Sequence, residues 1–263
     1  MNSELPVHFF TIVLNGMPFI RYHMDVFAKL PFRWHWHIIE GVADLVRDTA
    51  WSLRNGGQIS DILHKEGRSD DGTTQYLDGL AAKFPESITI YRKPCNVFWH
   101  GKLEMVQRPL ATLQEECLLW QIDVDELWTA EQLTKGHALF CRHPGKTAAL
   151  YYCHFYVGPE LVVTTLDTYG NYSSSEWLRT WHYMPGDCWQ SHEPPRLMRK
   201  MPSGSTFDVG RANPFKHAET SANGLIFQHY AYATEPQARF KQDYYGYGDA
   251  VAQWKLLQSQ KQF

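Results

Sequence analysis

The run from Cys117 to Trp128 constrains the fold of this chain more than any other stretch. It begins as a mostly apolar segment and ends in the acidic sequence Asp-Val-Asp-Glu at residues 123–126. A short apolar run that ends in polar residues is typical of a strand buried on both faces, as in a parallel sheet. Ligands of open α/β sheets bind outside the carboxyl ends of the strands. We therefore expect these carboxylates at a binding edge of such a sheet.

The spacing of Asp123 and Asp125 predicts a cation site. Successive side chains of a strand point to opposite faces, so these two carboxylates project the same way if the strand continues that far. Two convergent carboxylates suit a hard divalent cation that keeps open positions for phosphate oxygens. A solvated acidic turn after a strand is the alternative that the motif alone leaves open.

The preceding residues predict strands that alternate with helices. Strands are expected at Val7–Leu14, Trp34–Ile39, Ser87–Arg92 and Leu118–Ile122, and helices at Phe19–Leu30, from Ser69–Thr74 to Phe84, and at Gly101–Arg108. Alternation of this kind indicates a parallel sheet with right-handed crossovers. The segment Val42–Arg68 is expected to be a loop with a short helix near Ile59–His64.

The second half predicts a less regular architecture. We expect a short helix at Ala130–His137, one long strand at Thr147–Val157 paired with Glu160–Leu166, strands at Leu178–Met184 and Leu225–Ala231, a loop-rich region at Gly186–Pro214, and helices at Pro236–Tyr245 and Gly248–Gln262. The expected fold class is therefore α/β, with a mostly parallel central sheet flanked by helices and a more irregular C-terminal half.

Composition narrows the class of protein. The chain has 263 residues, of which 20% are charged and 44% hydrophobic, as expected for a soluble globular protein of one large α/β domain or two small ones. A net charge of −3 gives no general attraction to nucleic acid or acidic membranes. The 14% aromatic content fits a packed core, with a minority of rings free to stack on sugars or bases.

The cysteines and the N-terminus predict a cytoplasmic location. The five cysteines are widely spaced and form no Cys-x-x-Cys pair, which favours reduced thiols over a disulfide framework or a zinc knot. The first residues lack a cationic segment followed by a long apolar one, so no signal peptide is expected. No apolar run approaches the length of a transmembrane helix.

The order of several short motifs resembles GT-A fold glycosyltransferases of the family 2 type, over roughly residues 7–130. The matching features are a first strand ending at Asn15, a second ending at Glu40, Asp71-Gly72-Thr73 at a helix start, Lys93-Pro94, Lys102, and Asp123-Val124-Asp125. The chain departs from the family where Glu40 replaces the usual Asp and a longer stretch separates it from Asp71. These departures concern base binding more than the fold.

This resemblance implies a nucleotide-diphosphate sugar donor and a Mn²⁺ or Mg²⁺ ion. Metal ligands would be Asp123, Asp125 and a later histidine, for which His229 is the candidate; the alternative is a strand histidine with a satisfied hydrogen bond. Donor-binding residues would be Asn15, Glu40, Asp71, Lys102 and Asp123. Residues 1–128 would form the nucleotide-sugar-binding half and residues 129–263 the acceptor-side half, with a glycan, lipid-linked molecule or protein as acceptor.

An inverting transferase also needs a base that takes the acceptor proton. Glu193, in the sequence His-Glu-Pro-Pro, is the candidate, with Asp187 and Asp208 as alternatives. The basic residues Arg196, Arg199 and Lys200 could bind a diphosphate or form plain surface. A retaining mechanism would need no such base.

Two other functions remain open from the sequence. A metal-dependent phosphoesterase or nuclease would use the acids to hold two metals, and would need more acids and histidines at other strand ends. A non-catalytic carbohydrate-binding protein would use exposed Trp and Tyr rings without a metal.

Overall fold

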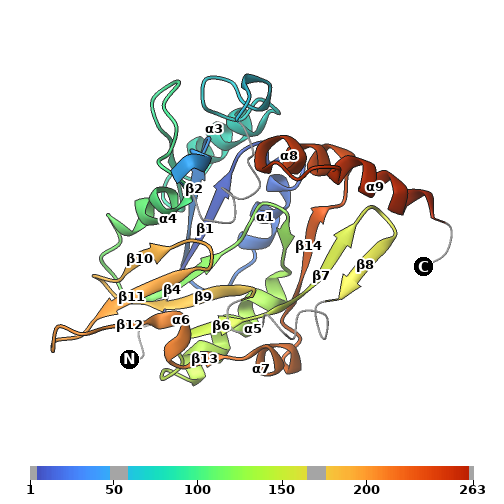
Figure 1. Cartoon of the computed structure of the whole chain (residues 1–263). Helices are drawn as coiled ribbons and strands as arrows, with labels where there is room; N and C mark the ends of the chain where they lie inside the picture. Colours follow the sequence, from blue (N-terminus) through green and yellow to red (C-terminus); the bar gives the residue numbers. More distant parts are fainter. Residues whose placement is uncertain (1–4, 48–58, 165–175, 261–263) are drawn as a thin grey trace.

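A seven-stranded sheet forms the centre of the computed structural model, which describes residues 5–47, 59–164 and 176–260 (Figure 1). Its strand order is β13-β6-β9-β4-β1-β2-β3. The strands are β1 (Val7–Val13), β2 (Trp34–Glu40), β3 (Ile88–Tyr91), β4 (Cys117–Gln121), β6 (Ala148–Leu150), β9 (Leu178–Tyr183) and β13 (Pro214–Phe215). β1 to β4 are mutually parallel, whereas β9 runs antiparallel to β4 and β6.

Helices cover both faces of this sheet because its strands are apolar on both sides. The helices are α1 (Ile20–Phe27), α3 (Thr73–Lys83), α4 (Lys102–Leu110) and α5 (Ala130–Arg142). Phe9 and Trp120 face one core with α1, α3 and α5. Phe10 and Leu119 face the other core with α4. The alternation of neighbouring residues between two cores explains why these strands read as continuous apolar runs.

Two smaller sheets extend the C-terminal half. One has the order β5-β14-β7-β8, formed by β5 (Glu126–Leu127), β7 (Tyr152–Val157), β8 (Leu161–Thr164) and β14 (Ile226–Tyr232). The other is antiparallel, with β10 (Cys188–Ser191), β11 (Arg196–Lys200) and β12 (Thr206–Asp208). Short helices α6 (Val209–Ala212) and α7 (His217–Ala222) follow, and α8 (Glu235–Tyr245) and α9 (Ala250–Ser259) complete the described chain, with single 3₁₀ turns at Leu45–Arg47 and Asp61–Leu63.

The expected α/β fold with a mostly parallel central sheet flanked by helices is confirmed. The four strands predicted in the first half are present, with ends within about two residues of those expected. The short helix predicted near Ile59–His64 is a 3₁₀ turn at Asp61–Leu63. The remainder of the expected Val42–Arg68 loop lies partly outside the described residues.

Three predictions for the second half were wrong. Thr147–Val157 is not one strand: β6 and β7 belong to different sheets, because the chain leaves the central sheet at the fully buried Tyr151. Gly186–Pro214 is not loop-rich, since it forms the three-stranded sheet whose Trp189 and Leu197 close one core. The helix expected at Ala130–His137 continues to Arg142, because Leu139 and Phe140 are also buried against the sheet.

The C-terminal helices return to the carboxyl end of the parallel strands (Figure 1). The Tyr244 hydroxyl donates to the Ala43 carbonyl oxygen at 2.9 Å and accepts from the Ala43 amide at 3.1 Å. This contact places α8 over the loop that follows β2. Among the helices that the structure describes, none combines the length and apolar character needed to cross a membrane.

Candidate functional site

A cavity of about 1110 Å³ lies at the carboxyl end of β1 and β4. Its lining comes from the residues that follow these strands, from β9 and β14, and from α8. Seven of the eight residues predicted from the sequence line it: Asn15, Asp71, Lys102, Asp123, Asp125, Glu193 and His229. The fold therefore brings together side chains that are far apart in the sequence.

Hydrogen bonds from β1 and α1 hold the backbone at the Asp-Val-Asp segment. The Thr11 hydroxyl donates to the Ile122 carbonyl at 2.6 Å and itself accepts from the Trp36 indole at 2.9 Å. The His23 ring on α1 lies 2.9 Å from the Val124 carbonyl oxygen through Nε2. Burial lowers the pKa of His23 from 6.5 to about 4, so the ring is neutral near pH 7 and donates its Nε2–H. The backbone between the two aspartates is thus held on both sides.

Asp125 lies beside His229, with 3.5 Å between Oδ1 and Nε2. Strand β14 pairs with β5 so that His229 is opposite Glu126, which sets this proximity. Burial alone would raise the pKa of Asp125, but His229 and Lys241 outweigh it and hold the pKa below its ordinary value. Asp125 is therefore ionised at neutral pH.

Asp123 and Glu126 share one arginine, Arg179 on β9. The guanidinium holds both oxygens of the buried Glu126 at 2.6–3.0 Å and reaches Asp123 Oδ2 at 3.3 Å. Burial alone would lower the pKa of Arg179, but Glu126 and Asp123 hold it above its ordinary value. Asp123 Oδ1 accepts from the Gln121 amide at 3.0 Å, so its carboxylate has two protein partners.

Lys102 and Glu193 meet at another side of the cavity. The Lys102 ammonium lies 3.5 Å from Glu193 Oε1 and 4.9 Å from the centre of the Tyr245 ring. His192 Nδ1 lies 4.0 Å from the same carboxylate oxygen. Burial alone would raise the pKa of Glu193, but Lys102 and His192 hold it below its ordinary value. Glu193 is therefore an ionised acceptor of protons, although a weaker base than an unpaired carboxylate.

Asn15 and Asp71 line the cavity while they also hold its backbone. The Asn15 amide donates to the Leu63 carbonyl at 2.7 Å and its oxygen accepts from the Asp70 amide at 2.8 Å. A left-handed φ of 56° at Asn15 turns the chain here, a conformation that Asn tolerates. Asp71 accepts from the amides of Met17 and Thr73, at 2.8 and 3.0 Å, and so joins the end of β1 to the start of α3.

Glu40 is the predicted site residue that the structure places away from the cavity lining. Its side chain is 0% exposed and accepts from Arg92 Nε at 2.6 Å. It also accepts from the Thr74 hydroxyl and from the Ser69 amide. This buried carboxylate stabilises the turn that carries Asp71, and any effect on a ligand passes through that turn.

The alternatives to Glu193 lie outside the cavity lining. Asp187 is buried, with Arg199 bound to both its oxygens at 2.7–2.9 Å. Asp208 caps α6 through the Gly210 amide and pairs with Arg196 at 3.3 Å. Arg196 and Arg199 of β11 thus pair with acids in or next to the small antiparallel sheet.

The protein supplies two side chains that could bind one divalent cation, so the remaining metal ligands would come from a bound substrate or water. No group of three or more His, Cys, Asp or Glu side chains in the described ranges is arranged to hold a metal ion. Asp125 and His229 are close enough for one ion to bridge, because ligands in an octahedral shell lie about 3 Å apart. The ring nitrogen that faces Asp125 is Nε2, whereas the other one, Nδ1, is buried without a hydrogen-bond partner among the described residues.

Sequence reasoning missed three residues that shape the site: His23, Glu126 as the partner of an arginine, and Arg179. A charged residue inside a strand that also carries Leu178 and Trp181 was the available signal for Arg179, since a buried charge needs a partner. His23 gave no such signal, because a histidine on an apolar helix face is common in cores.

Comparisons with known proteins find solved structures that resemble this chain only remotely. No family model matches the chain, and no curated protein matches its sequence. The chain is similar to S. aureus TarS 1–349, at 14% identity and a TM-score of 0.43, over 68% of this chain and 47% of that one. It is also similar to the mannosyltransferase PcManGT from Pyrobaculum calidifontis in complex with GDP-Man and Mn²⁺, at 16% identity and a TM-score of 0.42, over 69% and 45%. The chain thus spans less than half of either protein.

A third solved structure aligns along its whole length. This 4-diphosphocytidyl-2C-methyl-D-erythritol synthase is 11% identical, with a TM-score of 0.38, over 98% of this chain and 100% of that one. Because so few residues are identical, a function has to be inferred from the site itself.

Proposed function

We propose that this chain is a metal-dependent glycosyltransferase that moves a sugar from a nucleotide-diphosphate sugar to an acceptor. The supporting observation is the ionised Asp125 beside His229, in a large cavity at the carboxyl end of the parallel strands. A carboxylate suits Mn²⁺ or Mg²⁺, the imidazole beside it favours Mn²⁺ of the two, and two protein ligands leave positions for diphosphate oxygens and water.

The charges around the cavity support a cation-dependent donor. Asp123, Asp125 and Glu193 line it as carboxylates. The positive charge of Arg179 is engaged by Glu126, and that of Lys102 by Glu193. Six carboxylates line the cavity against four lysine or arginine side chains, so a diphosphate brought to this edge would meet net negative charge, which a bound cation would offset.

Each residue then has a role in the proposed reaction. Asp125 and His229 would hold the ion, which would neutralise charge on the departing diphosphate. Asp123 would orient the ribose or a metal-bound water, while Asn15 and Asp71 would shape the nucleoside side. Residues 1–128 would supply most of the donor site and residues 129–263 most of the acceptor site.

Glu193 is proposed as the base of an inverting transfer. Its carboxylate is ionised and lies within the cavity, so it can accept the proton of an acceptor hydroxyl. Lys102 beside it would contact a donor phosphate, and such a contact would weaken the pairing with Glu193 and strengthen the base.

A thermal-shift panel of UDP-, GDP-, dTDP- and CMP-linked sugars, with and without Mn²⁺, tests the donor. We expect one nucleotide class to raise the melting temperature, and only when Mn²⁺ is present, because a ligand stabilises the state that binds it. Stabilisation by glycans alone, without metal, would favour a carbohydrate-binding protein. No response to any nucleotide sugar would contradict the proposal.

Asp125→Asn tests the metal site directly. We expect turnover of the donor identified above to fall by at least about two orders of magnitude, since a ligand that stabilises leaving-group charge is lost. Asp70→Asn is the matched control, because Asp70 is an exposed aspartate in the same cavity lining. Equal activity of Asp125→Asn and Asp70→Asn would remove the proposed role of Asp125.

A further inference from the structure

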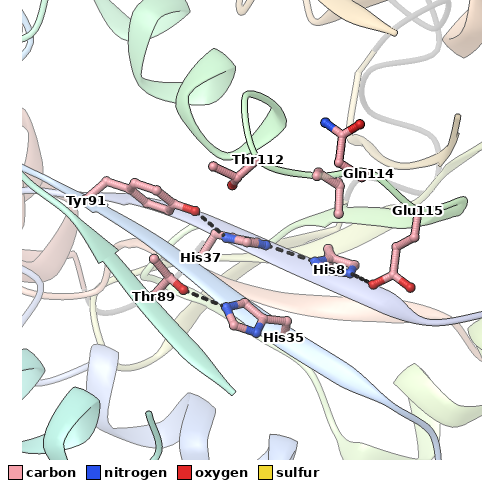
Figure 2. A pocket seen from close by; sticks show the side chains of 9 residues that line it. His8, His35, His37, Thr89, Tyr91, Thr112, Gln114 and Glu115 are labelled. Carbon is pink, nitrogen blue, oxygen red and sulfur yellow. Dashed lines mark hydrogen bonds and ion pairs between the residues drawn. The ribbon is translucent and has the colours of Figure 1, made fainter. Parts of the chain in front are cut away.

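A second cavity, of about 440 Å³, lies near the starts of β1, β2 and β4 (Figure 2). This cavity and the Asp125 site lie at opposite ends of β1: the strand begins beside this cavity, and its carboxyl end lies at the Asp125 site. Three histidines from neighbouring parallel strands line it: His8 on β1, and His35 and His37 on β2. His8 and His37 are 8% and 5% exposed, so both rings are largely removed from water.

A continuous chain of hydrogen bonds runs through this cavity (Figure 2). The Tyr91 hydroxyl lies 3.0 Å from His37 Nδ1, and His37 Nε2 lies 2.9 Å from His8 Nδ1. His8 Nε2 lies 3.1 Å from Glu115 Oε1, where the chain ends in a carboxylate that Arg33 also holds. His35 is outside the chain, with its Nε2 at 2.8 Å from the Thr89 hydroxyl.

The Glu115 carboxylate fixes which atom donates in each of these hydrogen bonds at neutral pH. Glu115 accepts hydrogen bonds only, because Arg33 holds its pKa below the ordinary value, and so His8 must donate through Nε2–H. A neutral His8 then accepts at Nδ1, which requires a donating Nε2–H on His37. His37 in turn accepts at Nδ1 from Tyr91, whose pKa burial raises. Both imidazoles are therefore assigned to the Nε2–H tautomer.

The same geometry accommodates one added proton but not two. Glu115 stabilises a proton that His8 takes up from solvent. The series of hydrogen bonds from Tyr91 to Glu115 then stays intact if His37 moves its own proton from Nε2 to Nδ1. The Tyr91 hydroxyl oxygen then accepts from His37. A second proton would place two N–H groups face to face across 2.9 Å, with no acceptor between them.

The groups packed around the pair leave Glu115 as the counter-charge at its His8 end. Arg33 shares Glu115, the His35 ring centre lies 4.5 Å from that of His37 with the rings tilted by 41°, and Arg108 lies 5.4 Å from the Tyr91 ring centre. Burial raises the pKa of the Cys117 thiol and the charge of Glu115 adds to that rise, so the thiol is neutral. Within the described part of the chain, the His37 ring contacts the side chains of His8, His35 and Tyr91, and none of them is a carboxylate.

We propose that the His8–His37 pair is a proton-operated clasp that stays closed with at most one added proton and opens when a second enters. Opening would move His37 on β2 away from His8 on β1, whereas the charged His8 stays paired with Glu115. Burial lowers the pKa of both rings, which places this event on the acidic side of neutrality.

Nitrogen-15 NMR of the histidine rings of the full-length chain tests the clasp. At pH 7.5 we expect both His8 and His37 as Nε2–H tautomers, and on acidification a change of His37 to Nδ1–H as His8 becomes charged. Two rings that titrate independently near pH 6.5, or a His8 protonated at Nδ1 at neutral pH, would overturn the proposal.

The double variant His8→Gln/His37→Gln provides the second test. Gln offers one donor and one acceptor, so it can keep the chain without taking up protons. Between pH 6.5 and 5 the folded-to-unfolded ratio should fall more steeply for the wild type than for the variant. For each additional proton that the unfolded wild type binds relative to the folded one, the extra fall is up to about tenfold per pH unit. His143→Gln, at an exposed histidine outside this cavity, is the control and should leave the wild-type slope in place.

Equal slopes for the wild type and the double variant would overturn the clasp. So would a Zn²⁺-dependent rise in wild-type melting temperature that the double variant lacks, since the rings would then form a metal site. Should the double variant not fold, the tautomers of the wild type decide the question alone.

Discussion

At the scale of single residues, the site depends on buried groups that hold the carboxylates in place. Arg179 binds Glu126 through both carboxylate oxygens, and Glu126 is completely buried. Burial raises the pKa of Glu126, whereas Arg179 opposes that rise and keeps the carboxylate paired. The same guanidinium nitrogen, Nη2, that binds Glu126 also reaches the Asp123 side chain. A change at Arg179 therefore alters both the stability of the fold and the position of an acid in the cavity.

Removing one member of this ion pair should cost more than removing both. We expect Arg179→Met alone, or Glu126→Gln alone, to lower the free energy of unfolding by about 3–5 kcal/mol, because an uncompensated polar group or charge stays buried. The double variant Glu126→Gln/Arg179→Met should recover part of this loss. Denaturant unfolding of the four proteins measures the coupling, and simply additive single effects would contradict the ion-pair interpretation.

At the scale of secondary-structure elements, close packing of α5 on β4 positions the acidic run. A Cβ built on Gly136 would lie 2.5 Å from the Trp120 ring, and Trp120 is fully buried. Glycine in this helix thus allows the helix axis to approach the strand that leads into Asp123. The Thr129–Gln132 capping box fixes where α5 begins, directly after β5.

Two helical glycines should respond to alanine in opposite directions. We expect Gly136→Ala to destabilise by about 1–3 kcal/mol, because overpacking against Trp120 exceeds the gain in helix propensity. Gly79→Ala, in α3 with nothing within 4 Å of the added Cβ, should stabilise by roughly 0.5–1 kcal/mol. Thermal or denaturant unfolding compares the two, and equal stabilisation would show that Trp120 can yield to the added methyl group.

At the scale of the whole molecule, one wall of the cavity forms because α8 returns to the N-terminal half. Residues of α8 line the cavity on one side and the ends of β1 and β4 on another. The Tyr244–Ala43 contact joins positions 201 residues apart. Bringing together segments so far apart in the sequence costs conformational entropy, and the contacts that hold α8 in place offset that cost.

Removal of the Tyr244 hydroxyl should loosen this closure. We expect Tyr244→Phe to cost about 1–3 kcal/mol, since the buried amide and carbonyl of Ala43 lose a shared partner. Tyr22→Phe is the control, because the Tyr22 ring is 50% exposed. The free energy of unfolding from denaturant titration provides the measurement, and equal values for the two variants would contradict the role of Tyr244.

Acid should destabilise the molecule before its carboxylates become protonated. The pKa of His23 is about 4 in the folded chain and 6.5 as an unperturbed group, so the unfolded state binds more protons between these values. Stability from a neutral His23 is complete above pH 6.5 and is lost as the pH falls towards 4, by up to about 1.4 kcal/mol per pH unit. Unfolding measured from pH 8 to 4 should show a shallower slope for His23→Gln. An unchanged slope would contradict this.

The first half of the fold was predictable because its signals are local. Buried strands of a parallel sheet read as apolar runs, and prolines and polar turns separate them from amphipathic helices. The position of Asp123 and Asp125 at the carboxyl edge followed from the same rule. The split of Thr147–Val157 between two sheets was not predictable, since an apolar run does not record which sheet each part joins.

By itself, the sequence determined an α/β protein whose acidic run ends a central strand, because periodicity and burial are properties of neighbouring residues. Only the tertiary structure decided which side chains meet. The register of β14 against β5 brings His229 to Asp125, and β9 places Arg179 on Glu126. Glu40, which resembled a ligand-binding acid, is instead buried on Arg92. Contacts between distant segments depend on strand order and register, and no local pattern encodes these.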